Sequence, residues 1–430
     1  MSDARHVVTH RICSEFKRFP NISMKPLDVS SLDSREASLA RAIDHAVHRR
    51  WISLTTLIGH ASNRIVHKLD APVGATLLVA TAQLMLLDRI PDHAVINCAV
   101  DWVRKNGHPR ATGFVNAVLR KITRLRSEII ETGVAGESDH FLRGDGSAWK
   151  LVEPVFKDSI DFQTGFSRKS WTRLVHEFGE KTATEIAVGS IAEAPIIVTA
   201  PENENLPDTV LQHDDSRFGV VPQNVDLANL FMSQPMLRAQ DPTSANSLDL
   251  VKDLNPRRIL DVCAGRGTKT KQLRALFPNA MIAATEPNDV RRAFLEELAP
   301  EIDVIVYKPN TDGPTEPFDL VVADVPCSNS GVFARRPEAR FRYDKKHIDS
   351  LVELQQEILQ DARSILQNKG HLLYATCSID PAENASQVAW LTSKQRMKFL
   401  AENSTMPSGY PGSDPTLWHD GGFAALLQAR

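Results

Sequence analysis

The feature that most constrains the fold is an alternation of apolar runs and helical segments from about residue 251 onward. Short apolar runs that predict strands lie at 258–262, 280–285, 303–307, 319–325 and 371–376. Segments with the apolar spacing of helices lie between them, at 268–277, 288–299 and 350–366. Strands that alternate with helices form a parallel sheet with helices on both faces. Residues 251–430 are therefore predicted to form a doubly wound, Rossmann-like α/β domain.

The first third of the chain has a helical pattern instead. In residues 34–58, Leu39, Ile43 and Val47 recur on one helix face, and residues 73–91 are apolar nearly all round. A helix that is apolar on every side is expected at the centre of a bundle, so residues 1–130 are predicted to form an all-α domain. Its last part carries a basic set, namely Arg104, Lys105, Arg110, Arg120, Lys121, Arg124 and Arg126. These residues are either a solvated face or a footprint for a phosphate backbone.

Two shorter regions separate these domains. Residues 131–166 lack periodicity and are rich in Gly, Ser and Asp, which predicts a linker. Residues 167–250 combine a helical pattern at 170–187 with short strand-like pieces such as 195–200, which predicts a small α+β module.

Length and composition place the chain among globular proteins of two or three domains. It has 430 residues, of which 42% are hydrophobic and 24% are charged. No apolar run reaches the ~18 to 20 residues that span a bilayer, and the N-terminus has no apolar export signal. The five cysteines form no CxxC pair, which disfavours a disulfide framework. We therefore expect a cytoplasmic protein with no membrane partner.

A candidate cofactor site follows the first predicted strand. The segment 261–273, DVCAGRGTKTKQL, is a glycine-containing turn that leads into a helix, where a backbone can approach a nucleotide-like ligand. Glu286 ends the second strand, where an acid can accept both ribose hydroxyls. The chain has no GxxxxGK[ST] and no complete GxGxxG, which disfavours ATP and NAD. The pattern favours S-adenosylmethionine, and hence a methyltransferase.

Asp324, Cys327 and Cys377 each lie just past the end of a predicted strand, so they are expected to face one crevice. A single free cysteine is commonly a small core residue, as we interpret Cys263, and two thiols are too few for a zinc site, so no metal is expected. A thiolate that adds to C6 of a pyrimidine makes C5 nucleophilic enough to take a methyl group. An acid near N3 stabilises that adduct. One carboxylate and two cysteines therefore predict the formation of 5-methylcytosine.

Several segments are similar to the Nol1/Nop2/Sun family of RNA 5-methylcytosine methyltransferases, namely 263–270, 324–331, 354–359, 374–384 and 420–428. The helical N-terminal region resembles the antitermination factor NusB, and 239–251 resembles the segment that leads into the catalytic domain of this family. A NusB-like domain before the catalytic domain is the layout of the bacterial small-subunit ribosomal RNA enzymes of the family. The resemblance implies a monomer that uses S-adenosylmethionine and acts on RNA, namely 16S ribosomal RNA, and not on DNA.

The resemblance also implies roles for individual residues. Cys377 would attack C6 of cytosine, Cys327 would assist release of the methylated RNA, and Asp324 would contact the cytosine edge. The residues implied to bind the cofactor are Cys263, Ala264, Gly265, Arg266, Gly267, Thr268, Lys269, Glu286, Asp312 and Asp324. Within this set, Glu286 would hold the ribose and Asp312 would lie near the adenine. The loop departs from the Ala-Pro-Gly-Gly-Lys of the family, because it reads Gly265-Arg266-Gly267-Thr268-Lys269.

Two alternatives remain at this stage. The first is a transfer RNA cytosine-5 methyltransferase, against which the NusB-like region argues. The second is an RNA-binding ribosome-assembly factor whose catalytic site has decayed. Decay would be expected to remove a cysteine or the acid, whereas Asp324, Cys327 and Cys377 are all retained.

Overall fold

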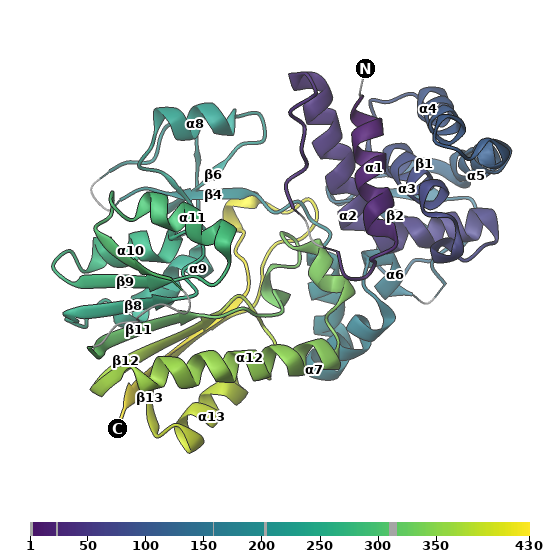
Figure 1. Cartoon of the computed structure of the whole chain (residues 1–430). Helices are drawn as coiled ribbons and strands as arrows, with labels where there is room; N and C mark the ends of the chain where they lie inside the picture. Colours follow the sequence, from purple (N-terminus) through teal and green to yellow (C-terminus); the bar gives the residue numbers. More distant parts are fainter. Residues whose placement is uncertain (1–2, 23–24, 158, 202–203, 309–315) are drawn as a thin grey trace. The chain divides into compact units, whose positions relative to one another are not determined.

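The computed structural model describes residues 3–22, 25–157, 159–201, 204–308 and 316–430 (Figure 1). The chain forms two compact units. Unit 1 consists of Met1–Glu193, Phe333–Tyr343 and Tyr410–Ser413, and unit 2 consists of Ala194–Val332, Asp344–Gly409 and Asp414–Arg430. Two short segments of the region expected to form the catalytic domain therefore belong to unit 1. The assignment of RNA-binding and catalytic functions to separate domains remains a prediction.

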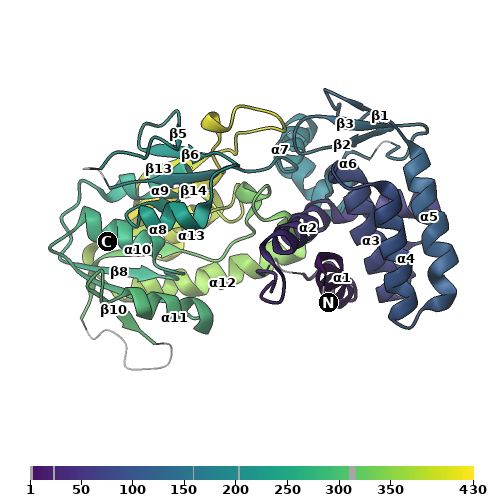
Figure 2. The ribbon, with the colours of Figure 1, turned by 90° about the horizontal axis from the view of Figure 1, so that it is seen from above.

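Unit 1 is mainly a helical bundle, as the apolar spacing predicted. Its helices are α1 (Ala4–Phe16), α2 (Ser34–Ser62), α3 (Ala71–Leu86), α4 (Asp92–Lys105), α5 (Thr112–Leu125), α6 (Ile160–Thr164) and α7 (Arg168–Gly189). Helix α3 is buried along nearly its whole length and contacts α1, α2, α4 and α5. Figure 2 shows α3, α4 and α5 side by side. Between α4 and α5 the chain turns at Gly107, whose φ of 89° suits glycine, and at Pro109.

The linker expected over residues 131–166 is instead a folded part of unit 1. An antiparallel sheet in the order β1–β3–β2 is formed by β1 (Arg126–Ile130), β3 (Ala148–Leu151) and β2 (His140–Leu142), and α6 follows it. Phe141, Leu151 and Phe156 are buried in the core of the bundle. The polar residues that suggested a linker occupy turns, as at Gly146 with a φ of 92°. Phe141, Leu151 and Phe156 indicated a folded segment more strongly than the polar residues indicated a linker, because each can bury much apolar surface.

The main sheet of unit 2 has seven strands. Their order is β10 (Val304–Tyr307), β9 (Met281–Thr285), β8 (Arg258–Val262), β11 (Phe318–Asp324), β12 (Leu366–Thr376), β14 (Gly422–Ala429) and β13 (Met397–Thr405). The strands from β10 to β12 are parallel, and β14 runs antiparallel to both β12 and β13. The doubly wound prediction is confirmed, with the correction that the sheet is mixed at its β13 edge. Between β13 and β14 the chain has the one-turn 3-10 helix Pro415–Leu417 in place of an α-helix, and this is why the sequence alternation did not extend to them.

Helices cover both faces of this sheet (Figure 1). Helices α10 (Thr268–Leu276) and α11 (Asp289–Leu298) lie on one face, and α12 (Lys345–Ser364) and α13 (Ala385–Lys394) lie on the other. Along β11, Leu320 packs into the first layer and Val321 into the second, so the strand is apolar on both sides. The chain runs from β8 to β9 in one direction and from β11 to β12 in the other. The strand order therefore reverses between the neighbouring strands β8 and β11. Folds of this class bind their ligands at this switch point, outside the carboxyl ends of the strands.

The α+β module expected over 167–250 is divided. Helix α7 belongs to unit 1, whereas a four-stranded sheet in the order β5–β6–β4–β7 belongs to unit 2. Its strands are β4 (Ile196–Thr199), β5 (Leu211–Gln212), β6 (Phe218–Val221) and β7 (Arg238–Ala239), and the helices α8 (Leu227–Ser233) and α9 (Pro242–Asn246) accompany them. Within the described part of the chain, no helix has the length and apolar character needed to cross a membrane.

Candidate active site

The carboxyl ends of β11 and β12 bring the two cysteines together. Asp324 ends β11 opposite Ala375 of β12, Cys327 lies in the loop after β11, and Cys377 directly follows β12. The two sulfur atoms are 3.1 Å apart. Two motifs 50 residues apart in the chain thus form one site.

Asn329 lies against both cysteines. Its side-chain amide donates to the backbone carbonyl of Cys327 at 3.0 Å, and its Oδ1 accepts from the thiol of Cys377 at 3.3 Å. Its φ of 59° is left-handed, a conformation that asparagine tolerates better than most residues. The turn after Cys327 therefore supplies a polar group that orients Cys377.

The two thiols differ in their surroundings. The hydrogen bond with Cys377, then burial and the charge of Glu383, raise the pKa of Cys327 well above its usual range. Cys327 therefore keeps its proton near neutral pH and can donate it toward the sulfur of Cys377.

An ion pair joins the cofactor loop to the cysteine site. Nζ of Lys269 lies 2.7 Å from Oδ2 of Asp324 and 3.1 Å from the hydroxyl of Ser244. Burial lowers the pKa of Lys269, but the charge and hydrogen bond of Asp324, together with Asp261 and Cys377, outweigh this effect, and the net shift is upward. Lys269 is therefore a charged ammonium, held beside the end of β11.

The loop between β8 and α10 is shaped by three residues with positive φ, at Cys263 (61°), Gly265 (61°) and Gly267 (87°). The φ of Gly267 favours glycine, and a Cβ built there would lie 2.7 Å from the side chain of Leu298 on α11. Burial, followed by nearby carboxylates, raises the pKa of Cys263 to about 12, so this thiol is not a nucleophile near neutral pH. We therefore interpret Cys263 as a residue that packs within the loop.

Two buried carboxyl groups support this loop from the sheet. Glu286 accepts from the backbone N–H of Gly265 through Oε2 and from that of Asn288 through Oε1, each at 2.8 Å. Asp261, on β8, accepts from the hydroxyl of Thr270 at 2.6 Å. Burial raises the pKa of Asp261 to about 7.

The remaining expected cofactor residues differ in position. Ala264 donates its N–H to the carbonyl of Thr285 at 2.9 Å, which ties the loop to β9. Arg266 is exposed, and its guanidinium lies 4.3 Å from the ring centroid of Phe294 on α11. Thr268 is the exposed first residue of α10. Asp312 lies outside the described residues.

The residues that sequence reasoning missed are polar groups around the cysteines and Lys269, namely Ser244, Ser328, Asn329, Gln355, Ser378 and Glu383. A signal was present for some of them, because each cysteine is directly followed by a serine. The partner of both serines is Glu383, which no local pattern identifies as buried.

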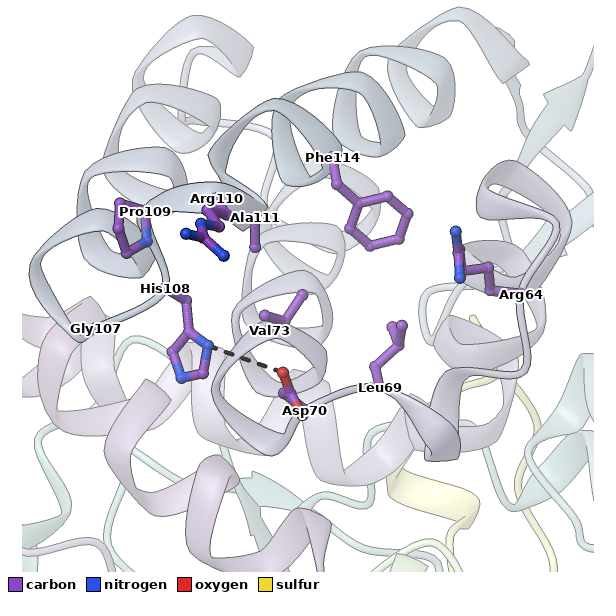
Figure 3. A pocket seen from close by; sticks show the side chains of 10 residues that line it. All are labelled: Arg64, Leu69, Asp70, Val73, Gly107, His108, Pro109, Arg110, Ala111 and Phe114. Carbon is purple, nitrogen blue, oxygen red and sulfur yellow. Dashed lines mark ion pairs between the residues drawn. The ribbon is translucent and has the colours of Figure 1, made fainter.

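Unit 1 has a separate pocket with a volume of about 600 Å³ (Figure 3). Its polar lining includes Arg64, Asp70, His108 and Arg110, and Phe114 forms one wall. The guanidinium of Arg64 lies 5.7 Å from the ring centroid of Phe114, and Nδ1 of His108 lies 3.9 Å from a carboxylate oxygen of Asp70. The pocket combines an aromatic surface with two exposed cations.

The fold and the loop at its switch point define a Rossmann-like methyltransferase joined to a helical domain. Residues 249–412 match the family model of the 16S rRNA methyltransferase RsmB/F, and residues 7–124 match that of the NusB family. The chain thus joins a region of the NusB family to a region of the RsmB/F family, as the resemblance predicted.

Curated relatives are similar over most of the chain. Ribosomal RNA small subunit methyltransferase B of Proteus mirabilis is 26% identical over 382 residues, which is 85% of this chain and 82% of that protein. The protein of the same name from Xanthomonas campestris is 27% identical, over 83% of this chain and 79% of its own length. The crystal structure of PH0851 is similar in fold, with a TM-score of 0.70 and 19% identity over 99% of each chain.

Proposed function

We propose that this protein transfers a methyl group from S-adenosylmethionine to C5 of a cytosine in 16S ribosomal RNA, through a covalent bond between Cys377 and C6. The observation that carries the proposal is the contact of two thiols, 3.1 Å apart, beside the 2.7 Å ion pair of Asp324 and Lys269. The names of the relatives, ribosomal RNA small subunit methyltransferase B, support the substrate.

The loop Cys263–Lys269, with Glu286, fits S-adenosylmethionine. Gly265 borders open space, since a Cβ built on it would meet no atom within 4 Å, and a ligand can therefore approach the backbone. Each oxygen of Glu286 accepts a backbone N–H and has a second lone pair, which leaves acceptor capacity for ribose hydroxyls. We also propose that Asp312 contributes on the adenine side. When bound, S-adenosylmethionine supplies an electrophilic methyl group.

The residues of the chain would act on the cytosine in two stages. In the first stage, Sγ of Cys377 would bond to C6, and the proton of its thiol would pass by way of the Asp324 carboxylate to N3, which keeps the adduct neutral. This addition makes C5 a nucleophile that can attack the methyl group. In the second stage, C5 loses its proton, the C5–C6 double bond re-forms and the bond from C6 to Cys377 breaks.

Cys327 would transfer the protons of the second stage, to the sulfur of Cys377 and from C5. Because it keeps its proton beside Cys377, it can protonate the departing sulfur and recover a proton from C5. The proton at N3 would pass to the Asp324 carboxylate and from there to solvent, and the release of this one proton balances the exchange of hydrogen for methyl at C5.

We further propose that unit 1 binds the RNA backbone. The basic set of the last helical segment is exposed, except for Arg126, which pairs with Asp92 and stacks on Trp149. Arg126 is therefore removed from the expected footprint. The pocket with Arg64, Arg110 and Phe114 supports the same function, because stacking and cationic groups are what unpaired RNA requires.

Methyl transfer from labelled S-adenosylmethionine to unmodified 16S ribosomal RNA tests the proposal. Cys377→Ala should reduce the rate at least about 1,000-fold, because the nucleophile is lost. Cys327→Ala should instead accumulate a covalent protein–RNA adduct. A Cys377→Ala variant that methylates as fast as the parent would overturn the mechanism. Faster methylation of transfer RNA would favour the first alternative, and a folded parent inactive on both RNAs would favour the decayed assembly factor.

A further inference from the structure

One buried carboxyl group connects the two loops that carry the cysteines. Ser328 follows Cys327, and Ser378 follows Cys377. Oε2 of Glu383 accepts from the hydroxyl of Ser328 at 2.5 Å and from that of Ser378 at 2.6 Å. Glu383 itself is fully buried at 0% exposure, so solvent does not compete for these bonds.

The other oxygen of Glu383 is held as well. Oε1 accepts from the backbone N–H of Ser328 at 2.8 Å and from Nε2 of Gln355, on α12, at 3.0 Å. Four donors from three parts of unit 2 thus converge on one carboxyl group. A carboxylate has about four acceptor positions and no proton to donate, so this set of donors matches the ionised group. Burial raises the pKa of Glu383, and the bonds from both serines oppose that rise.

Further hydrogen bonds hold the same two loops together. The backbone N–H of Gly331 donates to the carbonyl of Cys377 at 3.0 Å, and that of Ile379 donates to the hydroxyl of Ser330 at 3.0 Å. A Cβ on Gly331 would lie 2.3 Å from the carbonyl oxygen of Gly421, so the backbones meet too closely for a larger residue. The loops are therefore fixed in one register, with Glu383 at their junction.

We propose that Glu383 is a positioning residue whose buried carboxylate holds the two cysteine loops, and with them the two thiols, in register. The carboxylate does not reach the reacting atoms, and it acts through Ser328 and Ser378. Its negative charge opposes ionisation of Cys327, as does the neighbouring Cys377. Tyr374 of β12 and the buried Asp380 are further ionisable groups beside Glu383. The catalytic consequence rests on the proposed function, whereas the effect on the thiols does not.

The test compares Glu383→Gln and Glu383→Ala with the parent, using the full-length protein without RNA or cofactor. Initial rates of alkylation of Cys327 and Cys377 by iodoacetamide are measured between pH 6 and 10 by peptide mass spectrometry. Loss of the charge should increase the alkylation rate of Cys327 at pH 8 at least about threefold, because its thiolate becomes easier to form. Glu353→Gln, an exposed position on α12, is the matched control and should leave both profiles unchanged.

Methyl transfer gives the second measurement. Glu383→Ala should lower kcat at least about 100-fold with less than a threefold change in KM for RNA, because register rather than binding is lost. Glu383→Gln should lose about tenfold, because the serine hydroxyls can rotate to accept from its amide. If Glu383→Ala does not fold, Ser378→Ala, which removes one of the four bonds, should give an intermediate loss of kcat.

The two proposals fail in different ways. Unchanged alkylation profiles in folded Glu383→Gln would overturn the role of Glu383 even if the parent is an active methyltransferase. A parent that transfers no methyl group to RNA would overturn the proposed function, whereas the alkylation profiles would still decide whether Glu383 controls the thiols.

Discussion

The cysteine site of unit 2 and the pocket of unit 1 hold their polar side chains in opposite ways. At the cysteine site each charged group has a close partner, as Lys269 has in Asp324 at 2.7 Å. In the pocket the cations of Arg64 and Arg110 are exposed, and the closest ion pair, between His108 and Asp70, spans 3.9 Å. The first arrangement fixes geometry, and the second leaves side chains free to move.

This difference agrees with the two proposed tasks, catalysis at the cysteine site and RNA binding at the pocket. Chemistry at one ring atom requires groups held within a fraction of an ångström, because misplacement removes the advantage of proximity. Neutralising an RNA backbone requires charge at approximately the right place and tolerates flexible side chains. Substitutions at the cysteine site should therefore have large effects on turnover, and those in the pocket should have smaller effects on RNA affinity.

Apart from the variants of Cys377 and Glu383, the largest effect is expected for Lys269→Met. This variant leaves the carboxylate of Asp324 without its cation and removes the link between the cofactor loop and β11. We expect methyl transfer to fall at least about 100-fold, because an unpaired, partly buried charge reorganises its surroundings. The measurement is kcat on 16S ribosomal RNA, with Lys271→Met on the same helix as the control. Activity within threefold of the parent would show that the ion pair is dispensable.

A smaller effect is expected for Asp261→Asn, and it concerns stability. The folded-state pKa of Asp261 is about 7, above the ordinary 3.8. Its contribution to stability is therefore fully present below pH ~4 and is lost as the pH rises through 7. The amide of the variant cannot ionise, so the variant should lack this loss and be about 2 kcal/mol more stable than the parent at pH 8.

Chemical denaturation at pH 4.5 and pH 8 measures this difference, and Asp253→Asn, at an exposed position, is the control. If the free energies of unfolding of parent and variant changed equally between the two pH values, Asp261 would not be a buried ionisable group in solution.

Glu286→Gln should weaken S-adenosylmethionine binding about tenfold. The carboxylate accepts two backbone N–H groups at 2.8 Å, and an amide places a donor against one of them. Isothermal titration with S-adenosylmethionine gives the affinity, and Glu297→Gln, exposed on α11, is the matched control. An affinity equal to that of the parent would exclude Glu286 from the cofactor site.

Local patterns in the sequence predicted the parts of this molecule that local patterns determine. The alternation of strands and helices predicted the strands from β8 to β12, and the strand ends placed Asp324, Cys327 and Cys377 at one edge. The antiparallel strands β13 and β14 were not predicted, because their burial depends on pairing with β12 and not on their own periodicity.

The buried glutamate that supports the site could not be predicted, for a related reason. A buried glutamate such as Glu383 is identified only by its partners, which come from the loop after β11, the loop after β12 and helix α12. No spacing rule connects these three parts of the chain. Residues 131–166 gave the opposite error, because their polar turns concealed buried apolar side chains such as Phe141, Leu151 and Phe156.

For the pocket, Arg64→Ala and Arg110→Ala should each weaken RNA binding about three- to fivefold. Each removes one exposed cation, and the slope of log affinity against log salt should decrease by about 1 for each phosphate that is no longer neutralised. Filter binding of 16S ribosomal RNA at several salt concentrations measures both quantities, with Arg41→Ala, exposed on α2, as the control. If kcat at saturating RNA fell 100-fold instead, the pocket residues would contribute to turnover, as the residues of the cysteine site do, and not only to RNA affinity.

The smallest effect is expected for Arg266→Ala. This variant tests whether every residue of the cofactor loop contributes to cofactor binding. The guanidinium of Arg266 is exposed and lies 4.3 Å from the ring centroid of Phe294, where an exposed cation–π contact contributes about 0.5 to 1 kcal/mol to stability. Its loss should change the affinity for S-adenosylmethionine less than twofold, and Phe294→Ala should behave in the same way. A tenfold loss for Arg266→Ala alone would mean that the side chain leaves Phe294 and reaches the ligand, so that an exposed arginine of unit 2 acts like those proposed for the pocket.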